Sequence, residues 1–138
     1  MASAESLTSG YLSAALGRGQ DAASWFAGGV VAYASEVKFT VLGVREGPVI
    51  TADCARQMAL GVTALMRSDV SVAVTGVGGP DEEEGHPPGT VYVATNVGGH
   101  THVTRHHFSG EPGDVVDATV EAALGQLASG LESWVEDP

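Results

Sequence analysis

The sequence predicts an α/β protein in which helices cover both faces of a mixed β-sheet, as a three-layer α/β/α sandwich. Helical and extended patterns alternate along the chain, which is typical of sheets whose strands are joined by covering helices. Two extended runs are separated only by Gly98-Gly99, so these two strands form an antiparallel hairpin. The 138 residues fit a single domain over 1–138.

The first third of the chain has the pattern of a helix, a buried strand and a second helix. Residues 8–16 show helical apolar spacing, and Gly17 ends this helix. The run 26–34 combines aromatic and β-branched residues, which favours a buried strand. Ser35 is the expected N-cap of a short helix that Gly43 closes.

The middle of the chain predicts a longer helix followed by three strands. Thr51 is the expected N-cap of a helix that runs to Arg67. Its apolar residues fall on one face: Ala55, Met58, Ala59, Val62 and Met66. Residues 70–75 alternate with period two, and 90–97 and 100–109 form the hairpin.

The C-terminal segment has the most regular helical pattern of the chain. Apolar residues recur there at helical spacing: Val116, Val120, Ala123, Leu124, Leu127, Leu131 and Trp134. Leu131, Trp134 and Val135 near its end offer an apolar surface that would suit a homodimer.

Charge and cysteine content exclude several classes of protein. Six Lys and Arg against 17 Asp and Glu give a net charge of −11, which repels nucleic acid. No apolar run approaches the ~20 residues of a membrane helix, and the first residues lack the pattern of a signal peptide. The single Cys54 cannot form an internal disulfide and suits a small buried core position. These features predict a cytoplasmic protein without a membrane or nucleic-acid partner.

Ser6 and Thr8 lie just before the first predicted helix. Free backbone N–H groups at a helix N-terminus can stabilise an oxyanion or bind a phosphate. Taken alone, this segment is more simply explained as a helix N-cap.

Lys38 follows a predicted buried strand and begins a short helix. A lysine that is partly desolvated there would have a lowered pKa and could act as a general base. In isolation, a surface lysine on a helix is the simpler interpretation, and Tyr33 is more simply a core residue.

Residues 75–80, Thr-Gly-Val-Gly-Gly-Pro, follow an apolar strand. Ligands of open α/β sheets bind beyond the carboxyl ends of strands, and glycines allow the backbone to approach them. The segment matches neither a Walker sequence nor a dinucleotide fingerprint, so by itself it is a weak signal.

The three segments together resemble the CinA C-terminal domain family, the nicotinamide-nucleotide amidohydrolases also called PncC. The family's usual forms are Ala-Glu-Ser-x-Thr-Gly-Gly, Gly-Gly-x-Val-x-Tyr-x-x-x-x-Lys and Thr-Gly-x-x-Gly-Pro. Here 4–10 has the first form with Ser9 in place of a glycine, 28–38 has the second, and 75–80 has the third. Residues 88–92, Pro-Gly-Thr-Val-Tyr, are similar to the family's Pro-x-Gly-x-Val-Tyr. The resemblance extends over essentially the whole chain.

The resemblance implies deamidation of nicotinamide mononucleotide to the nicotinic acid nucleotide and ammonia. It makes Ser6 the nucleophile and Lys38 its base, while Tyr33 and Thr75 position the substrate or polarise its amide. A serine with an adjacent neutral lysine is a working nucleophile, and neither a metal nor an organic cofactor is expected. Further residues fall at positions expected to bind substrate: Thr8, Gly10, Gly76, Gly79 and Arg105.

The chain departs from the family pattern at several places. Relatives have a helix and a first strand before the Ala-Glu-Ser motif, so we expect that strand to be missing or to lie before the recorded start. After 108–110 the family has Asp-Arg and a second arginine four residues later, whereas 111–116 contains no arginine. Arg105, on the preceding strand, is the expected substitute for binding the phosphate. His86-Pro87 replaces the family's Lys-Pro.

Two alternatives to an active nucleotide deamidase remain open. The missing arginines favour a binding or regulatory protein that has lost turnover, or an amidohydrolase of a less phosphorylated substrate such as the nucleoside. His100, His102, His106 and His107 lack the companions of a metal site. The run 82–84 is expected to be a solvated acidic loop rather than a calcium site.

Overall fold

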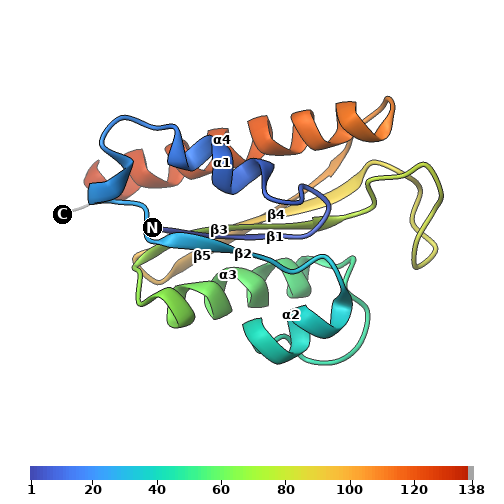
Figure 1. Cartoon of the computed structure of the whole chain (residues 1–138), viewed down its shortest axis with the longest axis horizontal. Coiled ribbons are helices and arrows are strands. Elements are labelled where there is room, and N and C mark those ends of the chain that lie inside the picture. The colour runs from blue at the N-terminus through green and yellow to red at the C-terminus, as the bar shows by residue number, and fades with distance from the viewer. Residues whose placement is uncertain (137–138) are drawn as a thin grey trace.

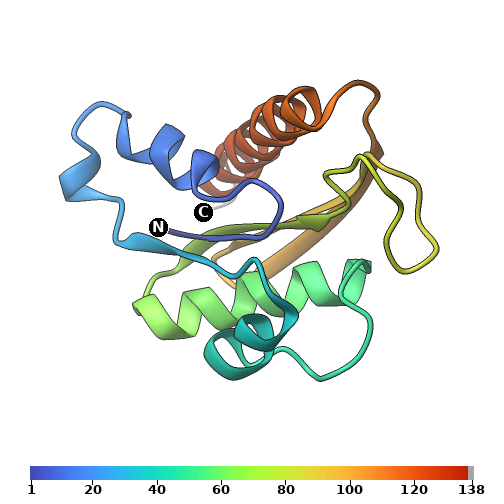
Figure 2. The ribbon, with the colours of Figure 1, turned by 45° about the vertical axis from the view of Figure 1, so that its right-hand side comes forward.

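The computed structural model describes residues 1–136, with side chains described up to Trp134, and it has three layers (Figure 1). Helices α1 (Tyr11–Gly17) and α4 (Pro112–Glu136) lie on one face of the sheet. Helices α2 (Ser35–Leu42) and α3 (Ala52–Met66) lie on the other, as a turned view also shows (Figure 2). This arrangement confirms the predicted α/β/α sandwich.

The sheet has five strands in the order β2-β1-β3-β4-β5. The interior strand β1 (Ala2–Glu5) pairs in parallel with β2 (Gly28–Val31) and β3 (Val70–Gly76). Strands β4 (Thr90–Val97) and β5 (His100–His107) form an antiparallel hairpin attached to β3. The sheet is therefore mixed, as the alternation of patterns and the Gly-Gly turn predict.

The expectation that the first strand is missing is wrong. Ala2–Glu5 forms that strand, and all four residues are buried between β2 and β3. The segment has no β-branched or aromatic residue, so its sequence gives no strand signal. Its place between two strands of the sheet, where small residues fit beneath helices on both faces, determines its conformation.

Several predicted boundaries also shift. Helix α1 begins at Tyr11 rather than Thr8, because residues 6–10 form a turn. Ala34, not Ser35, is the N-cap of α2, and no side chain caps this helix. A short 3₁₀ helix, Ala22–Ser24, precedes β2 and was not predicted. Thr51 does cap α3, where its hydroxyl accepts the N–H of Cys54 over 3.0 Å.

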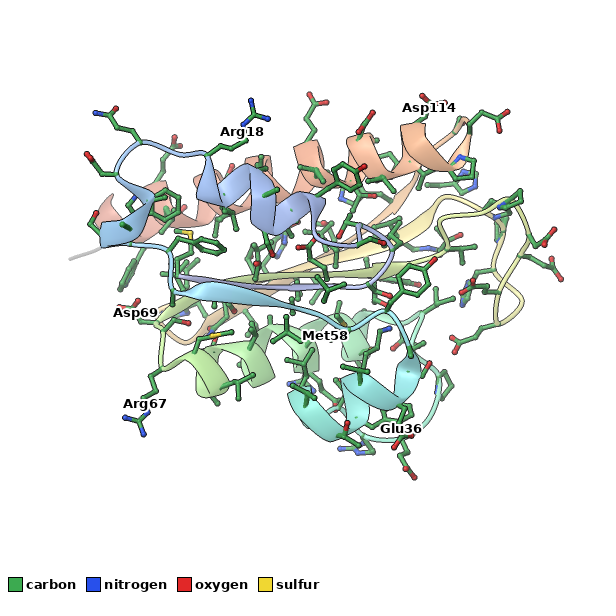
Figure 3. The ribbon with its side chains drawn as sticks, viewed as in Figure 1. Arg18, Glu36, Met58, Arg67, Asp69 and Asp114 are labelled. Carbon is green, nitrogen blue, oxygen red and sulfur yellow. The ribbon has the colours of Figure 1, made fainter. Side chains whose placement is uncertain are left out.

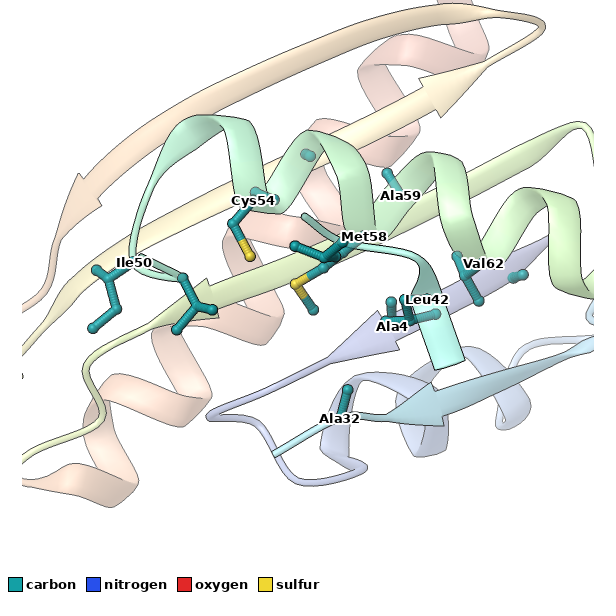
Figure 4. Packing of buried hydrophobic residues seen from close by; sticks show 14 of the residues in the cluster. Ala4, Ala32, Leu42, Ile50, Cys54, Met58, Ala59 and Val62 are labelled. Carbon is teal, nitrogen blue, oxygen red and sulfur yellow. The ribbon is translucent and has the colours of Figure 1, made fainter. Parts of the chain in front are cut away.

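Two hydrophobic cores lie on the two faces of the sheet. The first packs α3 and the loop before it against the sheet and includes Ile50, Met58 and Val62 (Figure 4). Cys54 is 2% exposed within it, which confirms its predicted core position. The second core packs Leu12 and Leu127, from α1 and α4, against the opposite face. None of the helices in residues 1–136 is long and apolar enough to span a bilayer.

The apolar surface that was predicted to support a homodimer lies at the end of α4. Trp134 is half exposed, and a Cβ placed on Gly98 would lie 2.7 Å from its Nε1, so the indole packs against the β4–β5 turn. The side chain of Val135 lies outside the described residues. The homodimer therefore stays a prediction.

Candidate active site

Ser6 and Lys38 meet at the carboxyl end of β1. Nζ of Lys38 lies 3.0 Å from Oγ of Ser6. Ser6 is 7% exposed and Lys38 is 1% exposed, so water has little access to the contact. Ser6 comes directly after β1, and Lys38 projects from the first turns of α2. The two side chains have the distance and the shielding that a nucleophile and its base require.

The link between β2 and α2 surrounds the amine of Lys38. Nζ donates hydrogen bonds to the carbonyl oxygens of Ala32, at 2.8 Å, and Tyr33, at 3.3 Å. Burial lowers the pKa of Lys38 below its ordinary value of 10.5, and the nearby Cys54, Glu83 and Glu84 oppose that shift. Desolvation is the largest effect and favours the neutral amine that a general base needs.

The two carbonyls also orient the amine. A neutral amine has two hydrogens and one lone pair, and Ala32 and Tyr33 accept two hydrogens. The remaining direction points at Oγ of Ser6. A neutral Lys38 therefore presents its lone pair to the serine hydroxyl.

The turn after Ser6 differs from the expectation of a free helix N-terminus. The N–H groups of Gly10, Leu12 and Ser13, at the start of α1, all donate to the carboxylate of Glu5. They are therefore not available to an oxyanion. Within residues 1–136, the N–H groups of Leu7 and Thr8 form no hydrogen bond, and they are the free donors nearest to Ser6 in the chain.

The hydroxyl of Thr8 is also engaged: it donates to Oε1 of Glu5 over 2.6 Å, and Thr8 is fully buried. Tyr33 contributes its carbonyl to Lys38, while its side chain is 68% exposed beside the site. The assignment of Thr8 and Tyr33 to the substrate stays a prediction.

Ser6, Thr75 and Arg105 lie in one row across the sheet. Continuing the Ala4–Ala73 register by two residues brings Ser6 level with Thr75. Thr75 pairs with Tyr92, and Tyr92 pairs with Arg105 on the edge strand β5. The row lies on the face covered by α3, since Tyr92 packs against that core. Arg105 is exposed, and its role in phosphate binding stays a prediction.

Thr75 and the glycines that follow it lie at the carboxyl end of β3. Thr75 is buried, and its hydroxyl donates to the carbonyl of Val49 over 2.9 Å. A Cβ on Gly76 would collide with the carbonyl oxygen of Thr90 on β4, so this position requires glycine for strand packing. Gly79 has φ +91°, the left-handed region that favours glycine.

Glu84 has a role that the sequence does not indicate. The three residues 82–84 are exposed, as predicted for a solvated loop. Glu84, however, accepts hydrogen bonds from the N–H groups of Val49 and Ile50 at 2.9 and 2.8 Å. Glu84 and Thr75 thus bind the N–H and the carbonyl of Val49, respectively. Only the contact between segments distant in sequence reveals this role.

The histidines of β5 do not form a cluster of metal-ligating side chains. His100 and His102 are exposed, and His106 stacks on Phe108 and contacts the hydroxyl of Thr104 at 2.9 Å. No group of three metal-ligating side chains occurs in the described part of the chain.

Two of the six Lys and Arg of the chain lie at the opposite end of the sheet from Ser6. Arg18 follows α1 and Arg67 follows α3, so both lie at the amino end of β1 and β3, away from the carboxyl end that carries Ser6 (Figure 3). The charged residues that act on Lys38 are acidic, Glu83 and Glu84. An anionic substrate would therefore meet negative charge beside Lys38.

The chain is thus an α/β domain with a three-layer mixed sheet and a buried serine–lysine pair. Comparison with known proteins names the family: residues 1–131 match the CinA C-terminal domain. The chain belongs to that family.

Relatives agree with this assignment. A competence-damage inducible protein of Bacillus subtilis is 40% identical over 115 residues, which cover 80% of this chain and 28% of the relative. The chain thus corresponds to about a quarter of that protein's length. A protein of the same kind from Bacillus pumilus is 36% identical over 96% of this chain and 33% of its own.

Solved structures are similar in fold. The crystal structure of competence damage-inducible protein A from Klebsiella pneumoniae matches with a TM-score of 0.92 and 37% identity, over 96% of this chain and 86% of that one. A CinA superfamily protein from Escherichia coli matches with a TM-score of 0.89 and 33% identity, over 92% and 77%.

Proposed function

We propose that this domain is an amidohydrolase that converts nicotinamide mononucleotide to nicotinic acid mononucleotide and ammonia. The contact between Ser6 and Lys38 is the observation that carries the proposal, because it joins a serine hydroxyl to a desolvated amine. The substrate comes from the resemblance of the motifs to the amidohydrolases of this family. Because phosphorylated nucleotides do not cross membranes unaided, the reaction would take place in the cytoplasm.

In the first half of the reaction, Oγ of Ser6 attacks the carboxamide carbon and its proton passes to Nζ of Lys38. The carbon–nitrogen bond then breaks as that proton moves to the leaving nitrogen, and ammonia departs. In the second half, water attacks the acyl-serine while Lys38 accepts its proton. The acid product leaves when that proton returns to Oγ of Ser6.

The carbonyl oxygen becomes negative during each attack and needs donors. The N–H groups of Leu7 and Thr8 are suitable, because they lie in the turn that carries Ser6 and are free. The amides of α1 are not suitable, because they bind Glu5. Lys38 cannot serve as a phosphate ligand while it is the neutral base, which leaves Arg105 as the nearest cation in the row.

A binding protein without turnover is the second candidate function. The observation in its favour is the charge at the site, where Glu83 and Glu84 act on Lys38, while Arg18 and Arg67 lie at the other end of the sheet. Such a site would bind a pyridine compound weakly or prefer the nucleoside, which lacks the phosphate.

The test is ammonia release from nicotinamide mononucleotide and from nicotinamide riboside, with Ser6→Ala as the control. Release that Ser6→Ala abolishes supports the amidohydrolase, and the ratio of the two rates decides the substrate. Calorimetric binding of the nucleotide without any release from either compound would instead establish the binding protein.

A further inference from the structure

Glu5 stands next to Ser6 in the chain but points to the opposite face of the sheet. Ala4 belongs to the core under α3, and side chains alternate along a strand. Glu5 therefore faces α1, whereas Ser6 faces α2 and Lys38. The carboxylate of Glu5 is fully buried.

A buried carboxylate is costly unless hydrogen bonds satisfy it. Glu5 is satisfied by five donors, all from residues 8–13. The N–H groups of Gly10, Leu12 and Ser13 donate at 3.1, 2.8 and 2.9 Å, and the hydroxyls of Thr8 and Ser13 complete the set. The turn that carries Ser6 thus starts at Glu5 and is tied back to the carboxylate of the same residue.

The same residue also reaches the other half of the site through its backbone. The carbonyl of Glu5 accepts the N–H of Ala32 over 2.7 Å. The carbonyl of Ala32 in turn accepts Nζ of Lys38 over 2.8 Å. Glu5 is therefore bonded both to the turn that carries the serine and to Ala32, the residue whose carbonyl orients the lysine.

Close packing reinforces this connection. The hydroxyl of Ser13, which bonds to Glu5, also contacts the hydroxyl of Ser3 at 2.8 Å. A Cβ on Gly29 of β2 would collide with both hydroxyls, so β2 lies directly against them. Movement of the Glu5 carboxylate would disturb β1, α1 and β2 together.

We propose that Glu5 is a positioning residue of this site: its buried carboxylate fixes the 6–10 turn so that Oγ of Ser6 faces Nζ of Lys38. The catalytic consequence of this role rests on the proposed function. Glu5 does not touch the substrate, and its effect is transmitted through Ser6. A simple N-cap of α1 would need one acceptor, whereas the two oxygens of Glu5 bind donors within the turn, from Thr8 and Gly10, and at the start of α1.

The test uses Glu5→Gln in the full chain. The amide keeps one acceptor oxygen, but its NH2 group faces the N–H of Ser13, so the turn must shift. Two controls are matched to it. Glu121→Gln removes the same charge at an exposed position of α4. Leu127→Ala loosens the core on the same face of the sheet without touching the site.

The readouts are kcat and KM for ammonia release and the NMR titration of the Lys38 side chain, each measured below the unfolding transition. We expect Glu5→Gln to lower kcat by about 100-fold with little change in KM, because an ~1 Å displacement of a reacting group has that effect. We also expect the Lys38 titration to move toward 10.5, its ordinary value, as water reaches the amine. Ser13→Ala, which removes one donor, should shift both readouts in the same direction by less.

The proposal is overturned if folded Glu5→Gln keeps the Lys38 titration of the wild type, or if Leu127→Ala reproduces its loss of kcat at equal stability. Absence of ammonia release from the wild type would defeat the proposed function instead. The titration of Lys38 would then decide the role of Glu5 by itself, since it reports the contact with Ser6 without turnover.

Discussion

The carbonyl of Ala32 accepts Nζ of Lys38 over 2.8 Å, although Lys38 lies six residues further along the chain. The same residue donates its N–H to the carbonyl of Glu5, directly before Ser6. The geometry of the serine–lysine pair thus depends on the pairing of β1 with β2. Helix α2 brings the lysine close, and the end of the β1–β2 ladder orients it.

Removing the amine of Lys38 should abolish most of the activity. We expect Lys38→Met to lower kcat by roughly 10²–10⁴-fold, the usual contribution of a general base. Arg18→Met is the control, because it removes a positive charge from an exposed position away from Ser6. A Lys38→Met protein that retains wild-type ammonia release would show that another group is the base.

Activity should rise with pH as Lys38 loses its proton. Because burial lowers its pKa, the midpoint of this rise should lie below 10.5. Measurement of kcat/KM against pH gives the midpoint for the free enzyme. A midpoint at or above 10.5 would contradict a desolvated base.

The same shift predicts how stability depends on pH. Between the lowered pKa of Lys38 and 10.5, the unfolded chain binds a proton at this lysine and the folded protein does not. The free energy of unfolding therefore rises with pH across this window. Urea unfolding of the wild type and of Lys38→Met at several pH values isolates the contribution of Lys38 to the free energy of unfolding. The rise with pH that Lys38 causes should be absent in the variant. A difference between the two proteins that does not change with pH would contradict the shift.

Cys54 should resist alkylation in the folded protein. The thiol is 2% exposed, and burial raises its pKa to about 11, so little thiolate forms near neutral pH. We expect iodoacetamide to label Cys54 only after unfolding, as followed by intact mass. Rapid labelling of the native protein would mean that the core under α3 opens readily.

Glu84 should stabilise the loop beside the site. Glu84→Gln weakens the hydrogen bonds from the N–H groups of Val49 and Ile50. We expect the free energy of unfolding to fall by about 1 kcal/mol, less than for a buried hydrogen bond to a charged group, because Glu84 is exposed. Glu82→Gln is the matched control in the same exposed run. Equal stability of the two variants would show that the contact contributes nothing.

Gly76 should tolerate no side chain. A Cβ there would meet the carbonyl of Thr90, so Gly76→Ala should cost about 1–3 kcal/mol through overpacking between β3 and β4. Gly125→Ala, in α4 with open space around it, should instead stabilise the protein by about 0.5–1 kcal/mol. Thermal unfolding of the two variants measures both effects, and a neutral Gly76→Ala would refute the close approach of the strands.

Patterns local in the chain predicted much of the fold. The apolar face of α3, the Thr51 cap and the Gly98-Gly99 hairpin all depend on neighbouring residues, and the structure confirms each. The family was likewise evident from short motifs. Strand β1 escaped prediction because four small or polar residues carry no local strand preference. Their burial between β2 and β3 determines the strand.

By itself, the sequence determined the chemistry that this site contains: one serine, one lysine and a glycine-rich loop at the ends of predicted elements. Tertiary structure alone decided their geometry. Nζ of Lys38 reaches Ser6 because α2 folds back over the end of β1, and its pKa falls because the surrounding core removes water. The carboxylate of Glu5 likewise binds the N–H groups at the start of α1 only because the folded chain brings them together. Desolvation and hydrogen bonding between distant segments depend on the folded chain, and no local pattern specifies them.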